Sequence, residues 1–252
     1  MNDRSTEPGG RLPPSVMQTR RRIFFDHDWQ FMRGRAGRRW LNQPCDNTNV
    51  DLPHCWNEKD AFQDGVAYYR CWGSYRREIG IDACGGNRGV ADASRWRLVS
   101  EGFYGTGDVW LNGCRLGSVD GQYLGFCFDV TDTLKRHAPN RIGIRLTNRC
   151  RRHVLPGIKM PDFLLYGGLS GRLFLEEIPG THIDVNSIRI TSSLPLDNRG
   201  KDISSASVTI DCVIAGPEAG TSRLSWRVLD GRRTVVADAQ GKRELPDNIV
   251  RT

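Results

Sequence analysis

The fold class of this chain is decided by the stretch EGFYGTGDVWLNGCRLGSVDGQYLGFCFDVTDTL, which runs from Glu101 to Leu134. Near its centre, the dipeptide Asn112-Gly113 separates Val109–Leu111 from Cys114–Leu116. A two-residue hairpin turn needs positive φ at both central residues, and Asn-Gly adopts that conformation at low cost. The stretch therefore predicts two antiparallel strands joined by a tight turn.

The same two-residue periodicity continues outside this stretch. Apolar side chains alternate with polar or small ones along three further segments, at Ile142, Ile144 and Leu146, at Val208, Ile210 and Cys212, and at Leu224, Trp226 and Val228. This alternation is typical of strands with one buried face. The 28 glycines of the chain punctuate such runs, and no long run has helical periodicity. We therefore predict an all-β protein built from sandwiches or barrels.

A domain boundary is predicted near Pro179-Gly180. The preceding residues have the pattern of a closing strand, and a new set of strands follows. Residues 181–252 predict about four strands, whereas an immunoglobulin-like sandwich has about seven; we expect these strands around Ile188 and over 208–214, 224–229 and 234–237. The second domain is thus expected to be incomplete. Residues 1–22 are expected to form a disordered N-terminal arm, and residues 23–180 the first domain.

The formal net charge of +7 comes mostly from arginine in this chain of 252 residues. A basic protein can bind nucleic acid, but the charge is spread out and no nucleic-acid-binding motif accompanies it. No segment approaches the roughly 20 apolar residues of a membrane span, and residues 1–22 lack the apolar core of a secretion signal. We therefore expect no nucleic-acid partner, no membrane partner and a cytoplasmic location.

The eight cysteines are scattered singly along the chain, without a Cys-x-x-Cys pair. Disulfide scaffolds are usually shorter and richer in cysteine, so we expect reduced thiols, several of them in the core. Cys150 with His153, and His54 with Cys55, have spacings that a metal could use. Two isolated pairs do not make a four-ligand site. We therefore predict no metal and no cofactor.

Six segments occur in the order that they have in family 2 of the glycoside hydrolases, which includes β-galactosidases, β-glucuronidases and β-mannosidases. They are Phe24–Gly34, Asp51–Phe62, Ser74–Ile79, Glu101–Leu134, Asn140–Asn148 and Pro161–Leu175. The chain resembles this family over about 150 residues. The resemblance implies a galactose-binding-like jelly-roll domain, then an immunoglobulin-like domain. In the family a TIM barrel follows and carries the chemistry.

Retaining glycosidases need two carboxylates, one as nucleophile and one as acid and base. The resemblance implies that both are glutamates on barrel strands, and we expect no barrel and no catalytic residue within this chain. Asn57-Glu58 is similar to the dipeptide that carries the acid/base of the family, but its segment belongs to the jelly roll. The isolated chain is therefore expected to be inactive.

Asp162 is the residue for which the resemblance implies a substrate contact. In similar enzymes, an aspartate ahead of the paired glycine reaches into the active site of the barrel and binds substrate hydroxyls. A carboxylate can accept charge-assisted hydrogen bonds from two neighbouring hydroxyls. The alternative is a turn aspartate that accepts from nearby backbone N–H groups.

The aromatic residues also suggest carbohydrate contact, because flat rings stack on sugar faces. Most of the tryptophans alternate with polar neighbours, as core residues do. Phe163, Tyr69 and Trp72 are the predicted exceptions, since they lie near loops or beside Asp162.

The sequence thus predicts a non-catalytic N-terminal portion of a β-galactosidase-like family 2 glycoside hydrolase. Two alternatives stay open: a stand-alone carbohydrate-binding module, and a structural subunit that complements a separately encoded barrel. The expected partners are a terminal β-glycoside, a catalytic barrel chain or a second copy of the chain. The sequence leaves the sugar open.

Overall fold

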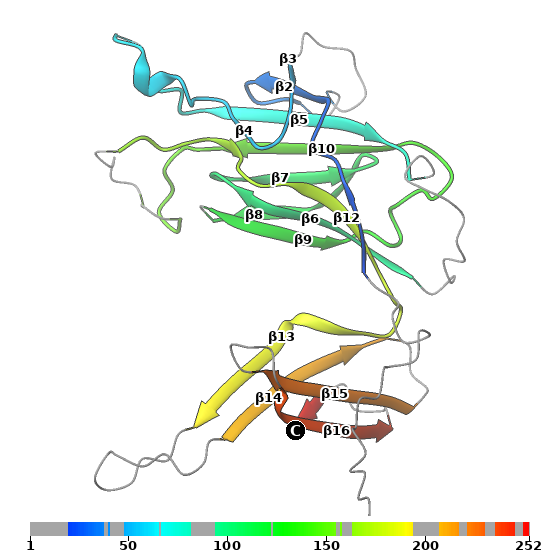
Figure 1. Ribbon diagram of the computed structural model, residues 1–252. Coiled ribbons are helices and arrows are strands. Elements are labelled where there is room, and N and C mark those ends of the chain that lie inside the picture. The colour runs from blue at the N-terminus through cyan, green and yellow to red at the C-terminus, as the bar shows by residue number, and fades with distance from the viewer. Residues whose placement is uncertain are drawn as a thin grey trace, which may run out of the picture. The chain divides into compact units, whose positions relative to one another are not determined.

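The computed structural model describes residues 20–37, 40, 48–65, 67–81, 94–121, 123–154, 157, 163–193, 207–216, 221–229, 235–244 and 249–251. Over these residues the protein is all-β, with a short 3₁₀ helix, η3 (Asp60–Phe62). It divides into two compact units, residues 1–178 and residues 179–252 (Figure 1). Within the described part of the chain, no helix is long and apolar enough to cross a membrane.

The first unit is a sandwich of two antiparallel sheets, which confirms the predicted jelly roll. The four-stranded sheet has the order β1 (Arg21–Phe24), β12 (Leu173–Ile178), β6 (Arg95–Phe103) and β9 (Leu124–Asp129). The six-stranded sheet has the order β3 (Thr48–Val50), β2 (Trp29–Arg33), β5 (Trp72–Ile79), β10 (Asn140–Thr147), β7 (Thr106–Leu111) and β8 (Cys114–Asp120). Most neighbours are distant in sequence, as Figure 1 shows for β5 between β2 and β10.

The hairpin that the sequence predicts joins β7 to β8. Asn112 and Gly113 have φ angles of 54° and 83°. The Asn112 side chain also secures the turn, because its Oδ1 accepts from the Arg141 N–H at 2.9 Å and its Nδ2 donates to the Thr133 carbonyl at 2.9 Å. The local sequence signal is therefore confirmed and reinforced by contacts to distant segments.

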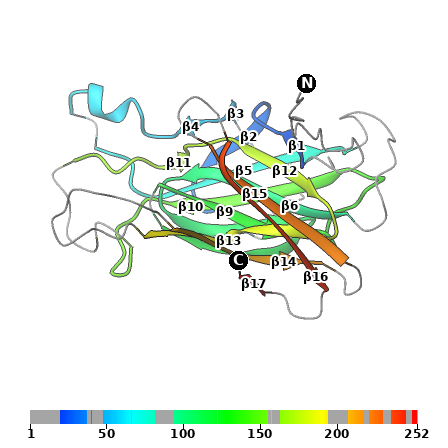
Figure 2. The same ribbon diagram turned by 60° about the horizontal axis from the view of Figure 1, so that its bottom comes forward.

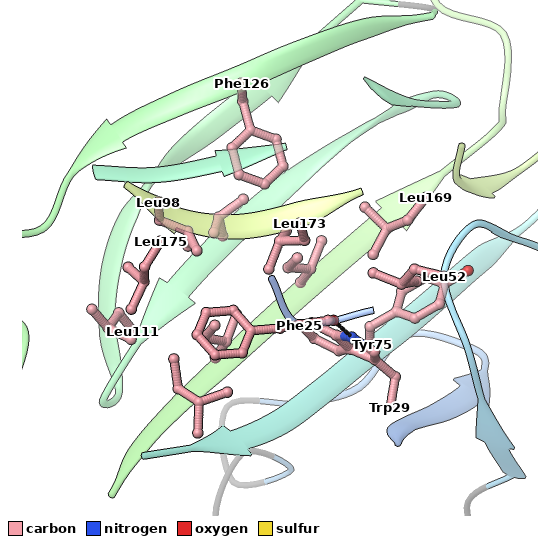
Figure 3. Close-up of a cluster of buried hydrophobic side chains, with 14 of the residues drawn as sticks. Phe25, Trp29, Leu52, Tyr75, Leu98, Leu111, Phe126, Leu169, Leu173 and Leu175 are labelled. Atoms are coloured by element: carbon pink, nitrogen blue, oxygen red, sulfur yellow. Dashed lines mark hydrogen bonds between the residues drawn. The ribbon is translucent and has the colours of Figure 1, made fainter. Parts of the chain in front are cut away.

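One core fills the space between the two sheets (Figure 3). Alternate residues of the strands contribute to it, as Ile142, Ile144 and Leu146 do from β10. Trp29 lies in this core, where its indole N–H donates to the Phe25 carbonyl at 2.6 Å. Of the tryptophans expected in the core, four are buried and Trp110 is only partly so; the buried ones are Trp29, Trp40, Trp56 and Trp96. Trp72, the predicted exception, is also partly buried.

The last two residues of the N-terminal arm predicted over residues 1–22 belong to β1, which begins at Arg21. Residues 1–19 lie outside the described residues. Arg22 pairs with Glu176 across the β1–β12 ladder, with 3.1 Å between Nε and Oε1. Glu176 is buried, so this charge-assisted bond gives the basic end of the arm a partner in the sheet.

The second unit has two sheets, seen from another side in Figure 2. One has the order β13 (His182–Ser193), β14 (Ser207–Ala215) and β17 (Ile249–Arg251), and the other pairs β15 (Thr221–Leu229) with β16 (Val235–Glu244). The strands predicted in this region are present. The last strand, β17, is an addition that the sequence did not indicate, because its three residues are too few to show a periodicity.

Six cysteines lie in the described part of the chain, and none of these six is in a disulfide: Cys55, Cys71, Cys114, Cys127, Cys150 and Cys212. Only Cys212 among them is buried, so the expectation of several core cysteines is wrong for these residues. Cys127 illustrates the reason, since it follows the buried Phe126 on β9 and therefore points to the other face of the strand.

Candidate functional site

The candidate site lies where the segment that follows Asp162 crosses the segment that contains Asn57. Strand β4 (His54–Cys55) pairs with β11 (Gly168–Leu169), so that Gly168 faces Cys55. The backbone N–H of Trp56 donates to the Gly167 carbonyl at 3.0 Å. These contacts join two segments that the family resemblance singles out and that are far apart in the sequence.

Asn57 is buried at this crossing and holds the backbone on both sides of Tyr166. Its Nδ2 donates to the Leu165 carbonyl at 2.9 Å. Its Oδ1 accepts from the Gly167 N–H, also at 2.9 Å, and from the Cys55 thiol at 3.3 Å. Because hydrogen bonds hold both Leu165 and Gly167, the backbone position of Tyr166 between them is also fixed.

Asn148 is fully buried just after β10 and reaches the same segment from the other side. Its Nδ2 donates to the Leu165 carbonyl at 3.0 Å and to the Tyr69 carbonyl at 3.1 Å. The Tyr69 N–H in turn donates to Oδ2 of the buried Asp60 at 2.8 Å. One asparagine thus ties together the two segments on which Tyr69 and Phe163 were predicted as site residues.

The paired glycines fit this crossing because there is no room for a side chain. A Cβ at Gly167 would overlap the Trp56 indole, and a Cβ at Gly73 would overlap the same ring from β5. Gly168 has a φ of 136°, a conformation that L side chains rarely adopt. The glycines therefore allow the segment to pass directly over Trp56.

The half-buried His54 and the fully buried Tyr75 form a polar pair at the crossing. His54 Nδ1 lies 2.8 Å from the Tyr75 hydroxyl, and burial lowers the pKa of His54. Burial also raises the pKa of Tyr75 well above its usual value. Both shifts favour the neutral forms, so this pair is a stable hydrogen bond rather than a proton-transfer couple at neutral pH.

The predicted site residues differ in what the structure says of them. Asp162 lies outside the described residues. Phe163 is 54% exposed and stands next to it in the sequence. Tyr69 donates its hydroxyl to the Trp72 carbonyl at 3.1 Å, and the Arg33 guanidinium lies 5.0 Å from the centre of its ring.

Trp72 is flanked by cations. The guanidinium groups of Arg35 and Arg145 lie 5.2 and 5.3 Å from the centre of its ring. Arg145 also lies 5.0 Å from the Trp110 ring. Arg145 therefore links the two half-buried tryptophans through cation–π contacts, and of the three aromatic residues predicted for the site, Phe163 is the one with a largely exposed side chain.

Sequence reasoning missed a cluster of three tyrosines, Tyr104, Tyr123 and Tyr166, which we call the tyrosine cluster. The ring centroids of Tyr123 and Tyr166 lie 5.1 and 5.7 Å from that of Tyr104. Tyr123 and Tyr166 are 54% and 39% exposed. The Tyr104 N–H donates to the Gly168 carbonyl at 2.8 Å, which places the cluster beside the crossing. The available signal was that each tyrosine lies within two residues of a glycine, at a break between strands.

Tyr123 has an unusual backbone for a bulky residue, with a φ of 65°. Its N–H donates to the Phe103 carbonyl at 3.0 Å, which holds this conformation. Partial burial raises the pKa of Tyr104, and the neighbouring phenols Tyr123 and Tyr166 add to the rise. The cluster therefore presents aromatic rings with hydroxyl groups, two of them exposed.

Glu58 is exposed, whereas the neighbouring Asn57 is buried. The two side chains of the Asn-Glu dipeptide therefore lie in different environments. Among the described residues, no three or more His, Cys, Asp or Glu side chains are grouped so that they could hold a metal ion. What the site offers is an exposed aromatic surface on a fixed backbone segment.

The jelly roll, the second unit of paired strands and the glycine-containing segment are arranged as in the N-terminal portion of family 2 glycoside hydrolases. The chain resembles that portion, as the sequence predicts. Its fold matches a family 2 glycosyl hydrolase of Bacteroides cellulosilyticus with a TM-score of 0.69 and 21% identity, covering 92% of this chain and 30% of that one. No family model matches the sequence.

Individual relatives carry the names of glycosidases. A β-glucuronidase of Bacteroides fragilis is 30% identical over 62% of this chain and 20% of its own length. A β-galactosidase of Bacteroides ovatus is 30% identical over 53% of this chain and 16% of its own length. The solved structure of β-glucuronidase 3 from Bacteroides uniformis is 26% identical with a TM-score of 0.71, over 92% of this chain and 30% of that one. The chain thus spans about a fifth of the length of the curated relatives it matches.

Proposed function

We propose that the first unit supplies substrate contacts to the catalytic barrel of a family 2 glycoside hydrolase, and that the chain has no glycosidase activity by itself. The observation that carries this proposal is the fixed segment 163–169. It follows Asp162 directly, and its exposed side chains Phe163 and Tyr166 lie on a backbone anchored by Asn57 and Asn148.

We propose two kinds of contact with the sugar, one from a carboxylate and one from aromatic rings. Asp162 accepts hydrogen bonds from two hydroxyls of a terminal β-glycoside, and charge-assisted bonds of this kind are the stronger ones. Phe163 offers a flat apolar face for the sugar ring. Tyr69 and Trp72 remain proposed contacts, although arginine side chains already lie over their rings.

The hydrolysis itself needs two carboxylates about 5–5.5 Å apart, which we assign to a barrel. That barrel is part of the same polypeptide or a separate chain, and a second copy of this chain is a further proposed partner. We retain the division into a jelly roll up to residue 180 and an immunoglobulin-like region at 181–252, with the proposed arm ending before β1. The proposed location is the cytoplasm.

The experiment compares the chain alone with a completed protein. The completed protein is a fusion of residues 1–252 with the part of the Bacteroides fragilis β-glucuronidase that follows the corresponding region. The unaltered Bacteroides fragilis enzyme is the positive control. Nitrophenyl β-glucuronide, β-galactoside and β-mannoside are the substrates. We expect turnover only from the completed protein. Turnover by the chain alone that Glu58→Gln abolishes would contradict the proposal, as would an inactive completed protein beside an active control.

A stand-alone carbohydrate-binding module is the second candidate function, and the tyrosine cluster is the observation that favours it. Clustered exposed aromatic rings on a monomer often mark a binding surface. Calorimetric titration of the isolated chain with methyl β-glucuronide and methyl β-galactoside separates the candidates. Tight binding that Tyr123→Ala abolishes would favour the module, whereas undetectable or millimolar binding supports the contribution to a barrel.

A further inference from the structure

The segment 163–169 is held by side chains rather than by a long strand. Its strand pairing is limited to the two-residue β11 and a single bridge between Gly168 and Tyr104. The Leu165 carbonyl and the Gly167 N–H are both satisfied by side chains. A short ladder by itself leaves a segment free to open locally. The asparagines that complete its hydrogen bonding therefore determine how well its position is defined.

Asn57 and Asn148 divide this task in complementary ways. Asn57 both donates and accepts, to Leu165 and from Gly167. Asn148 only donates, to Leu165 and to Tyr69, and its Oδ1 has no hydrogen-bond donor among the described residues. The Leu165 carbonyl thus accepts from both amides. Asn57 also accepts from the Gly167 N–H and the Cys55 thiol, and Asn148 also donates to the Tyr69 carbonyl.

We propose that Asn57 and Asn148 are positioning residues, which fix the segment 163–169 on the jelly roll and thereby set where its exposed side chains meet the substrate. The part that concerns substrate rests on the proposed function above, whereas the fixing of the segment does not. Neither residue touches substrate in this account. Both act through Leu165, and Asn57 acts also through Gly167.

The chain offers a matched control in Asn140, which is as fully buried at the start of β10. Its Nδ2 donates to the Lys135 carbonyl at 2.7 Å, and its Oδ1 accepts from the Lys135 N–H at 2.8 Å. The isosteric substitutions Asn57→Asp, Asn148→Asp and Asn140→Asp each replace a buried amide by a carboxyl group. They differ in which segment loses its donor.

The first measurement is hydrogen exchange of the isolated chain, read as protection factors at the Gly167 and Tyr166 amides from pH 5 to pH 8. Losing the donor and leaving a carboxylate against the Leu165 carbonyl should lower protection about ten- to a hundred-fold in Asn57→Asp. A protonated carboxyl group can donate to Leu165 and accept from Gly167, so protection in Asn57→Asp should recover as the pH falls.

The other two variants sharpen this pattern. Asn148→Asp should recover less at low pH, because one O–H cannot replace two donations. Asn140→Asp should leave the Gly167 and Tyr166 amides unchanged and expose the Lys135 amide instead. Equal loss of protection across the whole jelly roll in all three variants would overturn the proposal, since it would mean general destabilisation.

The second measurement is kcat/KM of the completed protein, with Asp162→Ala as the reference. We expect Asn57→Asp and Asn148→Asp to lower kcat/KM at least tenfold, and Asn140→Asp to leave it within about twofold. An effect of Asp162→Ala without an effect of the asparagine variants would refute the positioning role alone. Local loss of protection without any kinetic effect, Asp162→Ala included, would refute the proposed function and leave the fixing of the segment intact.

Discussion

The two units of the chain differ in how completely their apolar side chains are buried. In the first unit, both sheets contribute to one closed core, in which Leu98 and Ile144 are fully buried. In the second unit, the described residues include four apolar side chains that are 44–66% exposed, namely Val185, Ile188, Ile190 and Leu229. The alternation of apolar residues is equally clear in both sequences. It therefore predicts a strand, but it does not predict how completely the apolar face is covered.

This difference has an energetic consequence. Burial of apolar surface is the dominant favourable contribution to folding, roughly 25 cal/mol for each Å² removed from water. Among the second-unit residues whose burial is described (179–193, 207–216 and 226–229), Cys212 and Ile214 are the buried apolar residues. We therefore expect the first unit to carry most of the stability of the chain, and substitutions in it to have the larger effects.

The largest effect is expected from Leu98→Ala on β6. Removing a fully buried leucine side chain leaves a cavity, which typically costs about 2–5 kcal/mol. The matched change Ile190→Ala on β13 should alter the unfolding free energy by at most about 0.5 kcal/mol, because that side chain is 66% exposed. Urea unfolding followed by tryptophan fluorescence and circular dichroism measures both. Equal costs would contradict the contrast between the two units.

A smaller effect is expected where the first unit is closely packed around Trp56. Gly167→Ala places a methyl group against the indole ring, and overpacking of this kind costs about 1–3 kcal/mol. Gly37→Ala is the control, since no atom lies within 4 Å of a Cβ at that position. The thermal unfolding midpoint should fall for Gly167→Ala and stay nearly constant for Gly37→Ala. An unchanged midpoint in Gly167→Ala would show that the crossing is loose.

The smallest effect is a pH dependence that arises from His54. Because burial lowers the pKa of His54 below its usual 6.5, the unfolded chain binds a proton at this residue in a range where the folded chain does not. This contribution to stability is fully present above pH 6.5 and is lost as the pH falls through the folded pKa.

Unfolding measured at pH 7.5, 6.5 and 5.5 tests this prediction. His54→Gln can keep a hydrogen bond to Tyr75 and should flatten the decline in stability toward low pH. The control is His27→Gln, because His27 is an exposed partner of Asp51. If His27→Gln flattened the decline as much as His54→Gln, the half-buried His54 would not be its source.

Local sequence patterns were sufficient to predict the fold class, but they could not predict the contacts of the candidate site. The Asn112-Gly113 turn follows from two adjacent residues, and its φ angles agree with the prediction. The contact between Asn57 and Leu165 spans 108 positions of the sequence, so no local pattern could indicate it. Both asparagines do lie in segments that the family resemblance identified. Their role depends on which carbonyl each amide reaches, and only the fold determines that.

The aromatic residues show the same limit. Trp72 and Phe163 are both near loops in the sequence, and both were predicted to contact substrate. The structure surrounds Trp72 with two guanidinium groups, while Phe163 is more than half exposed. The tyrosine cluster went unnoticed because its members come from three separate breaks between strands. Exposure and clustering are properties of the folded chain, which a residue's neighbours in sequence do not reveal.

The central claim, that this jelly roll places a substrate-contacting residue in a family 2 active site, is tested most directly at Asp162. The measurement is kcat/KM of the completed protein on nitrophenyl β-glucuronide and β-galactoside, with and without Asp162→Ala, alongside the thermal unfolding midpoint of the isolated chain. Losing one charged hydrogen-bonding partner should lower kcat/KM about ten- to a hundred-fold, with the midpoint unchanged. Full activity in Asp162→Ala would contradict the claim, and a large fall in the midpoint would assign Asp162 to a structural turn instead.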